Sequence, residues 1–283
     1  NVDKFKPSYS FGDRSRSFLK IQDGCDYQCS YCTIPLARGK SRSPSLNSVI
    51  DSIKVLIDKG AQEIVLTGVN IGDYGITKNI NSRKNNFPDL LNQISKINDL
   101  KRLRISSIEP NLLNNDIIDL VSECEKILPH FHIPLQSGSD KILKLMKRRY
   151  LRNIYEKRFD YIKKRIPNAC IGSDVIVGFP GEDDLEFKET YDFLKSIDIS
   201  YLHVFSYSER SNTTSVLINN KVSKNLKNKR SKLLRELSNS KKLKFYKKNI
   251  KNYHNVLFEK ENKNGYIYGY TENYVRVKSL WSN

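Results

Sequence analysis

The sequence predicts an α/β fold built on six parallel strands, followed by a short antiparallel β segment. Apolar stretches of strand length alternate with stretches in which apolar residues recur at helical spacing. The fifth strand-like stretch, residues 171–179, is almost entirely apolar, as expected of a buried parallel strand. An open doubly wound sheet and a partial TIM-like barrel both fit this pattern, and in either fold the loops after the strands carry the chemistry.

Each element follows from a local pattern. Residues 44–59 place Leu46, Val49 and Ile53 on one helical face and end before Gly60, a residue type that commonly follows a helix C-terminus. Further helices are expected at residues 88–97, 115–125, from 139, 154–166, 183–196 and 222–250. Strands are expected at residues 18–22, 63–66, 102–106, 130–135, 171–179 and 201–207.

From about Tyr253 the pattern changes to short aromatic and β-branched segments, which predict strands at residues 256–259, 266–270 and 274–277. The intervening Asn264-Gly265 and Glu272-Asn273 are typical of hairpin turns. The segments resemble the start of a small antiparallel barrel, but such nucleic-acid-binding barrels have about five strands. We therefore expect a cut C-terminus, and the start without Met points to a fragment as well.

Composition narrows the classes of partner. The 283 residues contain 49 Lys and Arg against 31 Asp and Glu, a net charge of +18. Residues 219–251 hold most of the excess, with Glu236 as their one acid, which favours a polyanionic partner; a solvated helix face in a lysine-rich chain is the alternative. No apolar run could cross a bilayer, and the polar start is not a secretory signal. Five unevenly spaced cysteines argue against a disulfide framework.

The most specific motif is a CxxxCxxC sequence formed by Cys25, Cys29 and Cys32, directly after the first strand. Three thiolates on a short loop can bind three irons of a [4Fe–4S] cluster and leave the fourth iron open for chemistry. Zinc is the competing interpretation, but it needs a fourth ligand, and the nearest histidine in the sequence is His130. The spacing therefore favours an iron–sulfur cluster.

With Tyr31 before the last cysteine, this motif resembles the radical S-adenosylmethionine superfamily. The resemblance implies a partial (β/α)6 barrel, a [4Fe–4S] cluster whose open iron binds S-adenosylmethionine, and cleavage of that cofactor to a 5′-deoxyadenosyl radical. Several segments are similar to the methylthiotransferases of this superfamily. They are residues 18–25, 34–39, 41–43, 66–72, 132–139 and 174–182.

Residues 104–110, Arg-Ile-Ser-Ser-Ile-Glu-Pro, look like the class that acts on N6-threonylcarbamoyladenosine in tRNA. The resemblance thus implies insertion of a methylthio group at C2 of that nucleoside, next to the anticodon. It also implies the tRNA anticodon arm as partner, an electron donor such as flavodoxin or ferredoxin, and a cytoplasmic location. Alternatives are an isopentenyladenosine tRNA or a ribosomal-protein side chain as substrate, or a zinc-containing RNA-binding module without enzymatic activity. The oligomeric state does not follow from the sequence.

The resemblance also divides the chain. Residues 1–14 are expected to be a linker from an N-terminal domain whose three further cysteines would hold a second cluster. Residues 15–251 are expected to be the barrel with its basic helix, and residues 252–283 part of a TRAM-like RNA-binding β domain. The sequence departs from the family pattern at Ser211-Asn212, where Pro-Gly is usual, and at Ser223, where proline is usual.

Candidate cofactor-binding residues follow from the resemblance, at the ends of successive strands. They are Tyr31, Gly68, Asn70, Ser106, Glu109, Gln136, Ser173, Asp174 and Gly178. Structural alternatives remain at several positions: a plain turn at Gly68, a helix-start carboxylate at Glu109, and an ion pair of Asp174 with an arginine such as Arg104. Arg148 and Arg149 could reach the cofactor carboxylate or an RNA phosphate, or end a solvated helix.

Candidate RNA-binding residues combine cations with an aromatic side chain on which a base can stack. They are Arg38, Arg42, Lys229, Arg230, Lys241, Lys242 and Tyr268. His130 and His132 share one face of the fourth strand and are interpreted as core histidines or as residues behind the site. Cys124 and Cys170 are expected to be buried small apolar residues.

Overall fold

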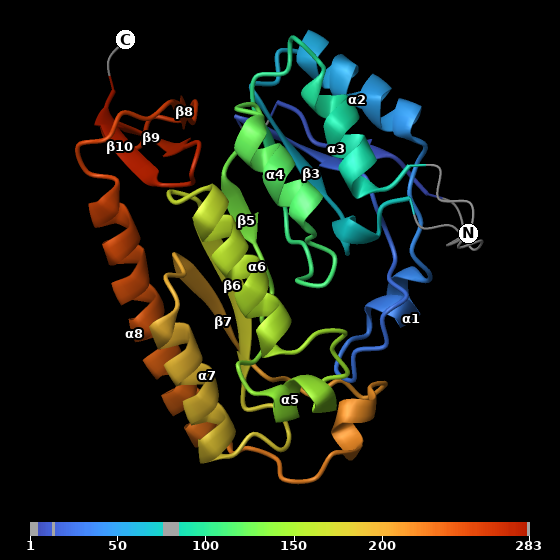
Figure 1. Cartoon of the computed structure of the whole chain (residues 1–283), viewed down its shortest axis with the longest axis vertical. Helices are drawn as coiled ribbons and strands as arrows, with labels where there is room; N and C mark the ends of the chain where they lie inside the picture. The colour runs from blue at the N-terminus through green and yellow to red at the C-terminus, as the bar shows by residue number, and fades with distance from the viewer. Residues whose placement is uncertain (1–4, 13–14, 76–84, 282–283) are drawn as a thin grey trace.

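Parallel strands, flanking helices and a separate antiparallel sheet make up the chain in the computed structural model, which describes residues 5–12, 15–75 and 85–281. Figure 1 shows the antiparallel sheet at one end of the barrel, where the parallel strands begin. The loop with the cysteines lies toward the opposite end, where these strands finish. No helix among the described residues is both long enough and apolar enough to cross a membrane.

Six parallel strands form the barrel wall in chain order, from β2 to β7. The strands are β2 (Arg16–Lys20), β3 (Glu63–Thr67), β4 (Leu103–Ile105), β5 (His130–His132), β6 (Cys170–Val177) and β7 (Tyr201–Ser206). Parallel bridges Leu103↔Ile127 and Ser107↔His132 connect the β4 side to the β5 side. The order never reverses as it would in a doubly wound sheet, and β7 is not paired with β2. The prediction of a partial barrel is confirmed.

The helices cover the outside of this wall (Figure 1). They are α1 (Ile34–Arg38), α2 (Leu46–Asp58), α3 (Phe87–Ser95), α4 (Asn115–Glu123), α5 (Asp140–Leu145), α6 (Arg152–Arg165), α7 (Asp184–Ser196) and α8 (Lys224–Lys248), with 3-10 turns η1 (Ile71–Asp73) and η3 (Thr214–Leu217). All except α1 and the 3-10 turns match elements expected from the sequence. The short α1 buries no residue, so it leaves no apolar periodicity from which to predict it.

The expected linker, residues 1–14, lies partly outside the described residues. Its described part contains β1 (Ser8–Tyr9), which pairs antiparallel with β2 through Ser8↔Lys20 and Tyr9↔Leu19. This two-residue strand was not expected.

Polar caps set the helix boundaries. The Asp183 side chain accepts hydrogen bonds at the start of α7 while Glu186 reaches back to the Asp183 backbone, forming a capping box. Ser223, one of the departures from the family pattern, caps α8 by accepting from the Leu226 N–H. The substitution therefore exchanges one good helix start for another.

One apolar cluster lies between the sheet and the helices. Leu66, Ile105, Ile133 and Val175 are at most 3% exposed and come from β3, β4 and the segments around β5 and β6. Cys170 is buried and Cys124 packs partly buried against this cluster, as expected for small apolar side chains. Because the core lies outside the wall, the side chains on the inner face of the strands are free to be polar.

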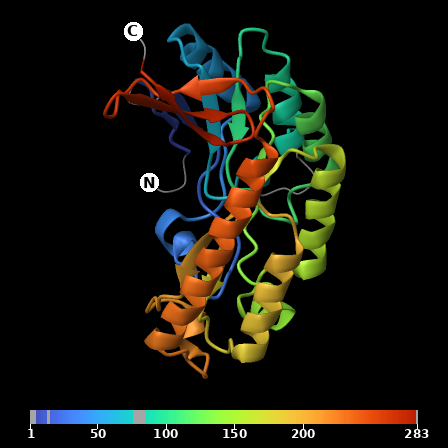
Figure 2. The same ribbon diagram turned by 90° about the vertical axis from the view of Figure 1, so that its left-hand side faces the viewer.

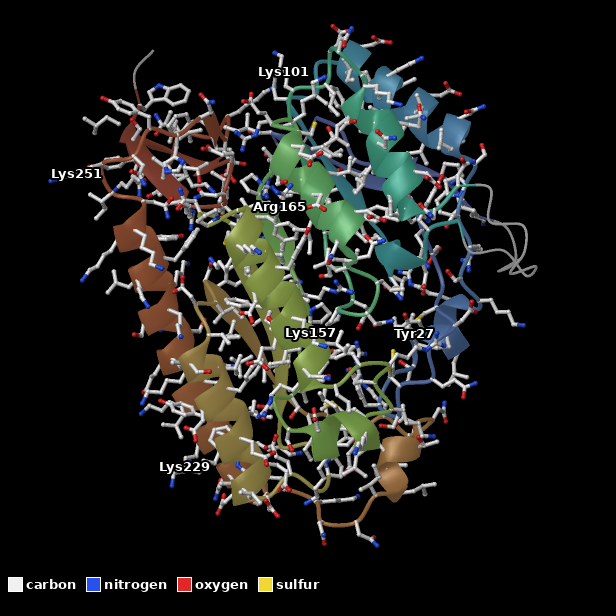
Figure 3. The ribbon with its side chains drawn as sticks, in the orientation of Figure 1. Tyr27, Lys101, Lys157, Arg165, Lys229 and Lys251 are labelled. Carbon is white, nitrogen blue, oxygen red and sulfur yellow. The ribbon has the colours of Figure 1, made fainter. Side chains whose placement is uncertain are left out.

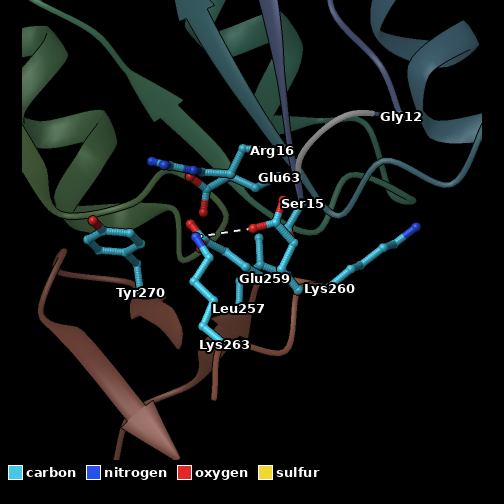
Figure 4. Close-up of a pocket in the computed structure, with 10 residues that line it drawn as sticks. Gly12, Ser15, Arg16, Glu63, Leu257, Glu259, Lys260, Lys263 and Tyr270 are labelled. Carbon is cyan, nitrogen blue, oxygen red and sulfur yellow. Dashed lines mark ion pairs between the residues drawn. The ribbon is translucent and has the colours of Figure 1, made fainter. Parts of the chain in front are cut away.

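The antiparallel sheet consists of β8 (Val256–Phe258), β9 (Tyr266–Thr271) and β10 (Arg276–Leu280), in the order β10-β9-β8. It packs on the amino ends of the first barrel strands. Arg102 and Arg104 donate to the backbone carbonyls of Tyr270, Thr271 and Glu272. A pocket of about 310 Å³ remains at this junction, with Arg16 and Glu63 on the barrel side (Figure 4).

Tyr274 closes this end of the barrel. It sits in the turn between β9 and β10 at φ +68°, a conformation that is uncommon outside glycine. Its ring lies 4.2 Å from the His130 ring and 4.8 Å from the Arg104 guanidinium. The antiparallel sheet is thus attached through side chains inserted into the barrel, in addition to the connecting helix α8, which runs up to it in Figure 2.

Candidate active site and its cysteine loop

The cysteine loop leaves β2 through a tight turn. Gly24 has φ +72°, and a Cβ added there would lie 2.0 Å from the Lys40 carbonyl oxygen, so only glycine fits. The Cys25 N–H donates to the Gly39 carbonyl at 3.0 Å, which ties the loop to the end of α1. Burial raises the pKa of Cys25 to about 11, and burial also raises that of Cys29, against the opposing effect of Arg148. A metal would therefore have to displace protons from these thiols.

The three cysteines fit a cluster better than a single ion. All three are free and half-buried. Among the described residues, the group of three potential ligands whose donor atoms all lie within 4.8 Å of one another is His132, Asp174 and His203. The cysteine sulfurs are thus more widely spread than the ligands of one zinc ion, which at a Zn–S distance of about 2.3 Å stand about 3.8 Å apart. Sulfurs that bind different irons of one cluster can be farther apart.

Arg148 connects the cysteine loop to the loop after β4. It donates to Cys29 Sγ at 3.1 Å and to the Tyr31 hydroxyl at 3.3 Å, and it forms an ion pair with Glu109. The Arg148 side chain is 5% exposed, so it is not a solvated helix end. Burial raises the pKa of Glu109, and Arg148 opposes that rise. The candidate residues Tyr31 and Glu109 therefore meet at a cation buried beside the sulfurs.

The loop after β3 presents Gly68 and Asn70 next to β2. The Asn70 backbone N–H donates to Gln22 Oε1 at 2.8 Å, and its side-chain amide donates to Asp73 at 2.6 Å. The Asn70 Oδ1 atom is buried without a hydrogen-bond partner, so this acceptor is available to a ligand. A Cβ at Gly68 would lie 2.9 Å from the Gln22 carbonyl oxygen, which means that packing alone already requires glycine there.

The remaining cofactor candidates, Ser106, Gln136 and Gly178, differ in their surroundings. Ser106 and Gln136 are half-buried at the ends of β4 and β5, and Gln136 has φ +65°. Gly178, after β6, has φ +71°, and a Cβ there would lie 2.3 Å from Cγ of Lys227. The left-handed φ favours glycine at this position, whereas the flexible Lys227 side chain could move away from an added Cβ.

Two expectations for β6 need correction. Ser173 is fully buried and bonds backbone atoms of Ile133 and Leu135, so it cannot bind ribose hydroxyls in this structure. Arg104 pairs with Glu63 at 2.8 Å, and Asp174 instead lies 3.2 Å from a ring nitrogen of each of His132 and His203. Successive residues of a strand face opposite sides, which puts Ser173 in the core and Asp174 on the inner face.

Comparison with known proteins identifies the superfamily. Residues 19–194 match the Radical SAM superfamily. The chain belongs to this superfamily. Two solved structures resemble the fold at low identity. A radical S-adenosylmethionine methyltransferase of Kitasatospora setae has a TM-score of 0.55 at 18% identity, covering 67% of this chain and 36% of that one. Methylornithine synthase has a TM-score of 0.52 at 15% identity, covering 81% and 61%.

Curated relatives are more similar to this radical SAM chain in sequence. The threonylcarbamoyladenosine tRNA methylthiotransferase MtaB of Aquifex aeolicus is 41% identical over 263 residues, and that of Bacillus subtilis 40% over 278. A tRNA-2-methylthio-N(6)-dimethylallyladenosine synthase of Clostridium tetani is 37% identical, covering 88% of this chain and 54% of the relative. The chain spans 62% and 60% of the lengths of the first two relatives, which cover 93% and 95% of it.

Two of the predicted RNA-binding residues of this radical SAM chain are not accessible to RNA. Arg230 is 2% exposed and pairs with Glu182 at 2.8 Å, and Lys241 is 9% exposed and donates to the carbonyls of Lys195 and Ile197. Both lie on the face of α8 that packs against α7. The prediction for these two residues is wrong because α8 is basic on all sides. Charge alone therefore does not distinguish its buried face from its exposed face.

The other predicted RNA-binding residues have more surface. Lys229 and Lys242 are exposed on α8, and Lys229 projects away from the barrel in Figure 3. Arg42 and Arg38 both pair with Asp23 beside the cysteine loop, and their side chains are 16% and 52% exposed. Tyr268 is half-buried, and the Arg276 guanidinium lies 4.8 Å from its ring centroid. Whether these residues contact RNA remains a prediction.

Proposed function

We propose that this chain is the radical SAM part of a tRNA methylthiotransferase that acts on N6-threonylcarbamoyladenosine next to the anticodon. The observation that carries the proposal is the loop of Cys25, Cys29 and Cys32 at the carboxyl end of the barrel, in a sequence 41% identical to such an enzyme. Because the chain spans about three fifths of that relative, the complete reaction is proposed for the full-length protein. An isopentenyladenosine substrate is less well supported, since two relatives named for threonylcarbamoyladenosine are 41% and 40% identical, whereas three named for dimethylallyladenosine are 35–38% identical. A protein substrate has no support among these relatives.

In this proposal the cysteines would hold a [4Fe–4S] cluster. When bound and reduced, this cluster together with S-adenosylmethionine would supply the radical chemistry needed at C2 of the adenine. The chain's own residues would position the cofactor and enclose the site. Arg148 holds Glu109 beside Cys29 through a buried ion pair, and Asn70 offers a free buried acceptor suited to an amino group. Tyr31 and the fully buried Phe179 meet edge to face at 6.1 Å and give this side of the site an apolar wall.

The remaining parts of the chain have proposed roles as well. Residues 15–251 form the barrel unit and residues 252–283 part of a TRAM-like domain that binds RNA. We propose the tRNA anticodon arm as partner, an electron donor of the flavodoxin or ferredoxin type, and a cytoplasmic site of action. Gly68, Ser106, Glu109, Gln136 and Gly178 remain proposed cofactor contacts in addition to those above.

Nucleoside analysis tests the function directly. In cells lacking the full-length protein, mass spectrometry of tRNA digests is expected to show N6-threonylcarbamoyladenosine without its 2-methylthio derivative. Reintroducing the gene should restore the derivative, whereas a Cys29→Ala gene should not. Loss of the methylthio group from dimethylallyladenosine instead would identify the other nucleoside as substrate and contradict the proposal.

The proposed RNA contact predicts a salt dependence. The double substitution Lys229→Ala with Lys232→Ala removes two exposed cations from α8. Affinity falls as salt concentration rises, and the variant should make this negative slope of log affinity against log salt shallower by about 1.4 to 1.8. Fluorescence anisotropy with a labelled anticodon stem-loop measures this slope. Lys54→Ala with Lys188→Ala, two exposed lysines on α2 and α7, is the matched control. Equal slopes for all three proteins would show that α8 does not contact the RNA.

A further inference from the structure

Three polar side chains meet on the inner face of the barrel. His132, Asp174 and His203 come from the neighbouring strands β5, β6 and β7, and Asp174 is paired with His203 across the sheet. One Asp174 oxygen lies 3.2 Å from His132 Nε2 and 3.2 Å from His203 Nδ1. Burial opposes ionisation of Asp174, but the two histidines lower its pKa below the ordinary value. The group is therefore a carboxylate that holds two imidazole rings.

The hydrogen bonds within this group leave capacity for a ligand. His132 is 8% exposed, and its Nδ1 lies 2.5 Å from the Ser107 hydroxyl, which fixes the ring. Its Nε2 is buried without an aligned hydrogen bond, although it faces Asp174. The His203 side chain is 54% exposed, so its ring is accessible to a ligand. His132 is thus held between Ser107 and Asp174, and His203 is the ring of this group with surface left for a ligand.

A pocket of about 360 Å³ opens beside His203. Its walls include Tyr201, Tyr246 and Tyr274 together with the cations Lys242 and Arg276, and they come from β7, α8 and the antiparallel sheet. Aromatic walls with two cations suit a ligand that is polar and carries a negative charge. The Ser107 hydroxyl that contacts His132 lies two residues before Glu109, and the Arg148 partner of Glu109 donates to Cys29. These contacts connect the histidine group to the cysteine loop.

We propose that His203, oriented by Asp174, together with Lys242 and Arg276 recognises the polar, anionic substituent on N6 of the substrate adenosine. The inference rests on the proposed function. C2 and N6 project from different sides of the adenine ring. When C2 faces the cysteine loop, the N6 substituent therefore projects from another edge of the ring, where the histidine group and its pocket can receive it.

The chemistry of the two candidate nucleosides differs at this substituent. A threonylcarbamoyl group has a carboxylate, a hydroxyl and a urea, which can pair with the two cations and with His203. A dimethylallyl group has no hydrogen-bonding atoms and offers these side chains no partner. A site built for hydrogen bonds rejects an analogue that lacks them far more strongly than an apolar pocket rejects an extra polar group. The pocket therefore selects the threonylcarbamoyl form.

Binding measurements test this inference without turnover. Anticodon stem-loops carrying N6-threonylcarbamoyladenosine, N6-dimethylallyladenosine or adenosine at one position are titrated into the chain at fixed salt with EDTA present. The threonylcarbamoyl RNA is expected to bind about tenfold more tightly than the others. His203→Phe keeps an aromatic ring and should abolish the preference, whereas His203→Gln should restore part of it. His254→Phe, which changes a histidine outside the pocket, should leave it intact.

The outcomes separate this inference from the proposed function. Equal binding of the three RNAs by the unsubstituted chain, or equal weakening of all three by His203→Phe, overturns the inference and leaves the tRNA proposal standing. Absence of salt-sensitive RNA binding contradicts the tRNA proposal and the inference with it. A preference that appears only when Zn²⁺ replaces EDTA would identify the three side chains as metal ligands and would also overturn the inference.

Discussion

Replacing Cys29 and Cys32 together with Ala is expected to abolish assembly of the iron–sulfur cluster. The two sulfurs supply two of the three protein ligands, and Cys25 alone cannot retain the cluster. After anaerobic reconstitution with iron and sulfide, the unsubstituted chain should show the broad charge-transfer absorption of a [4Fe–4S] cluster and about four irons per chain. The variant should show neither, and its cleavage of S-adenosylmethionine should fall to background.

Cys124→Ala is the matched control, because this half-buried thiol lies at the end of α4, away from the cysteine loop. It should retain the absorption, the iron and the cleavage. A variant that keeps its cluster without Cys29 and Cys32 would contradict the ligand assignment. A chain that binds one zinc and no iron would favour the RNA-binding module instead of the enzyme.

Replacing Glu63 with Ala is expected to destabilise the fold by about 3 to 5 kcal/mol. The Glu63 side chain is completely buried and bonds Arg104 at 2.8 Å and Arg102 at 2.9 Å. Its removal leaves Arg104, 3% exposed, without its carboxylate, and loosens the contact between the barrel and the antiparallel sheet. Urea denaturation followed by circular dichroism measures the change in unfolding free energy.

The same carboxylate predicts a pH dependence. Burial opposes its ionisation, but Arg104 and Arg102 lower the pKa of Glu63 below the ordinary value of 4.5. Because the pKa of Glu63 is lower in the folded state, its ionised carboxylate stabilises the fold fully above pH 4.5. This stabilisation is lost as the pH falls through the folded-state pKa. The stability difference between the unsubstituted chain and Glu63→Ala should therefore shrink in acid. Glu261→Ala, at an exposed pair with Lys263, should change stability by less than about 0.5 kcal/mol at any pH.

Much of the barrel could be predicted because its elements carry their own signals. The residue 171–179 stretch reads as a strand from its apolar side chains alone, and β6 spans Cys170–Val177. The cysteine spacing likewise marks a metal site without any tertiary information. The closure could not be predicted from the pattern, because it depends on bridges such as Ser107↔His132 between segments that are far apart in sequence.

Side-chain partners were the weaker part of the prediction. Arg230 looked like an RNA contact because nothing in a uniformly basic helix marks the residue that pairs with Glu182 and Asp184. Arg148 follows α5 by only a few residues, and its placement on Cys29 depends on how α5 folds back under the cysteine loop. The partnership of His203 with Asp174 depends on the register of two strands, which a single sequence does not contain.

The continuous helix α8 sets a fixed distance in the molecule. Its first turns pack against Gly178 and Glu182 after β6, and beyond its last turn Asn249 accepts a hydrogen bond from Asn273 of the antiparallel sheet. At 25 residues it is about 37 Å long. The helix therefore fixes the separation of these two contacts. Deleting one turn would bring its ends about 5.4 Å closer together, and the two contacts could not both form after such a shift. Changes in its length should therefore be tolerated far less well than changes in its exposed charges.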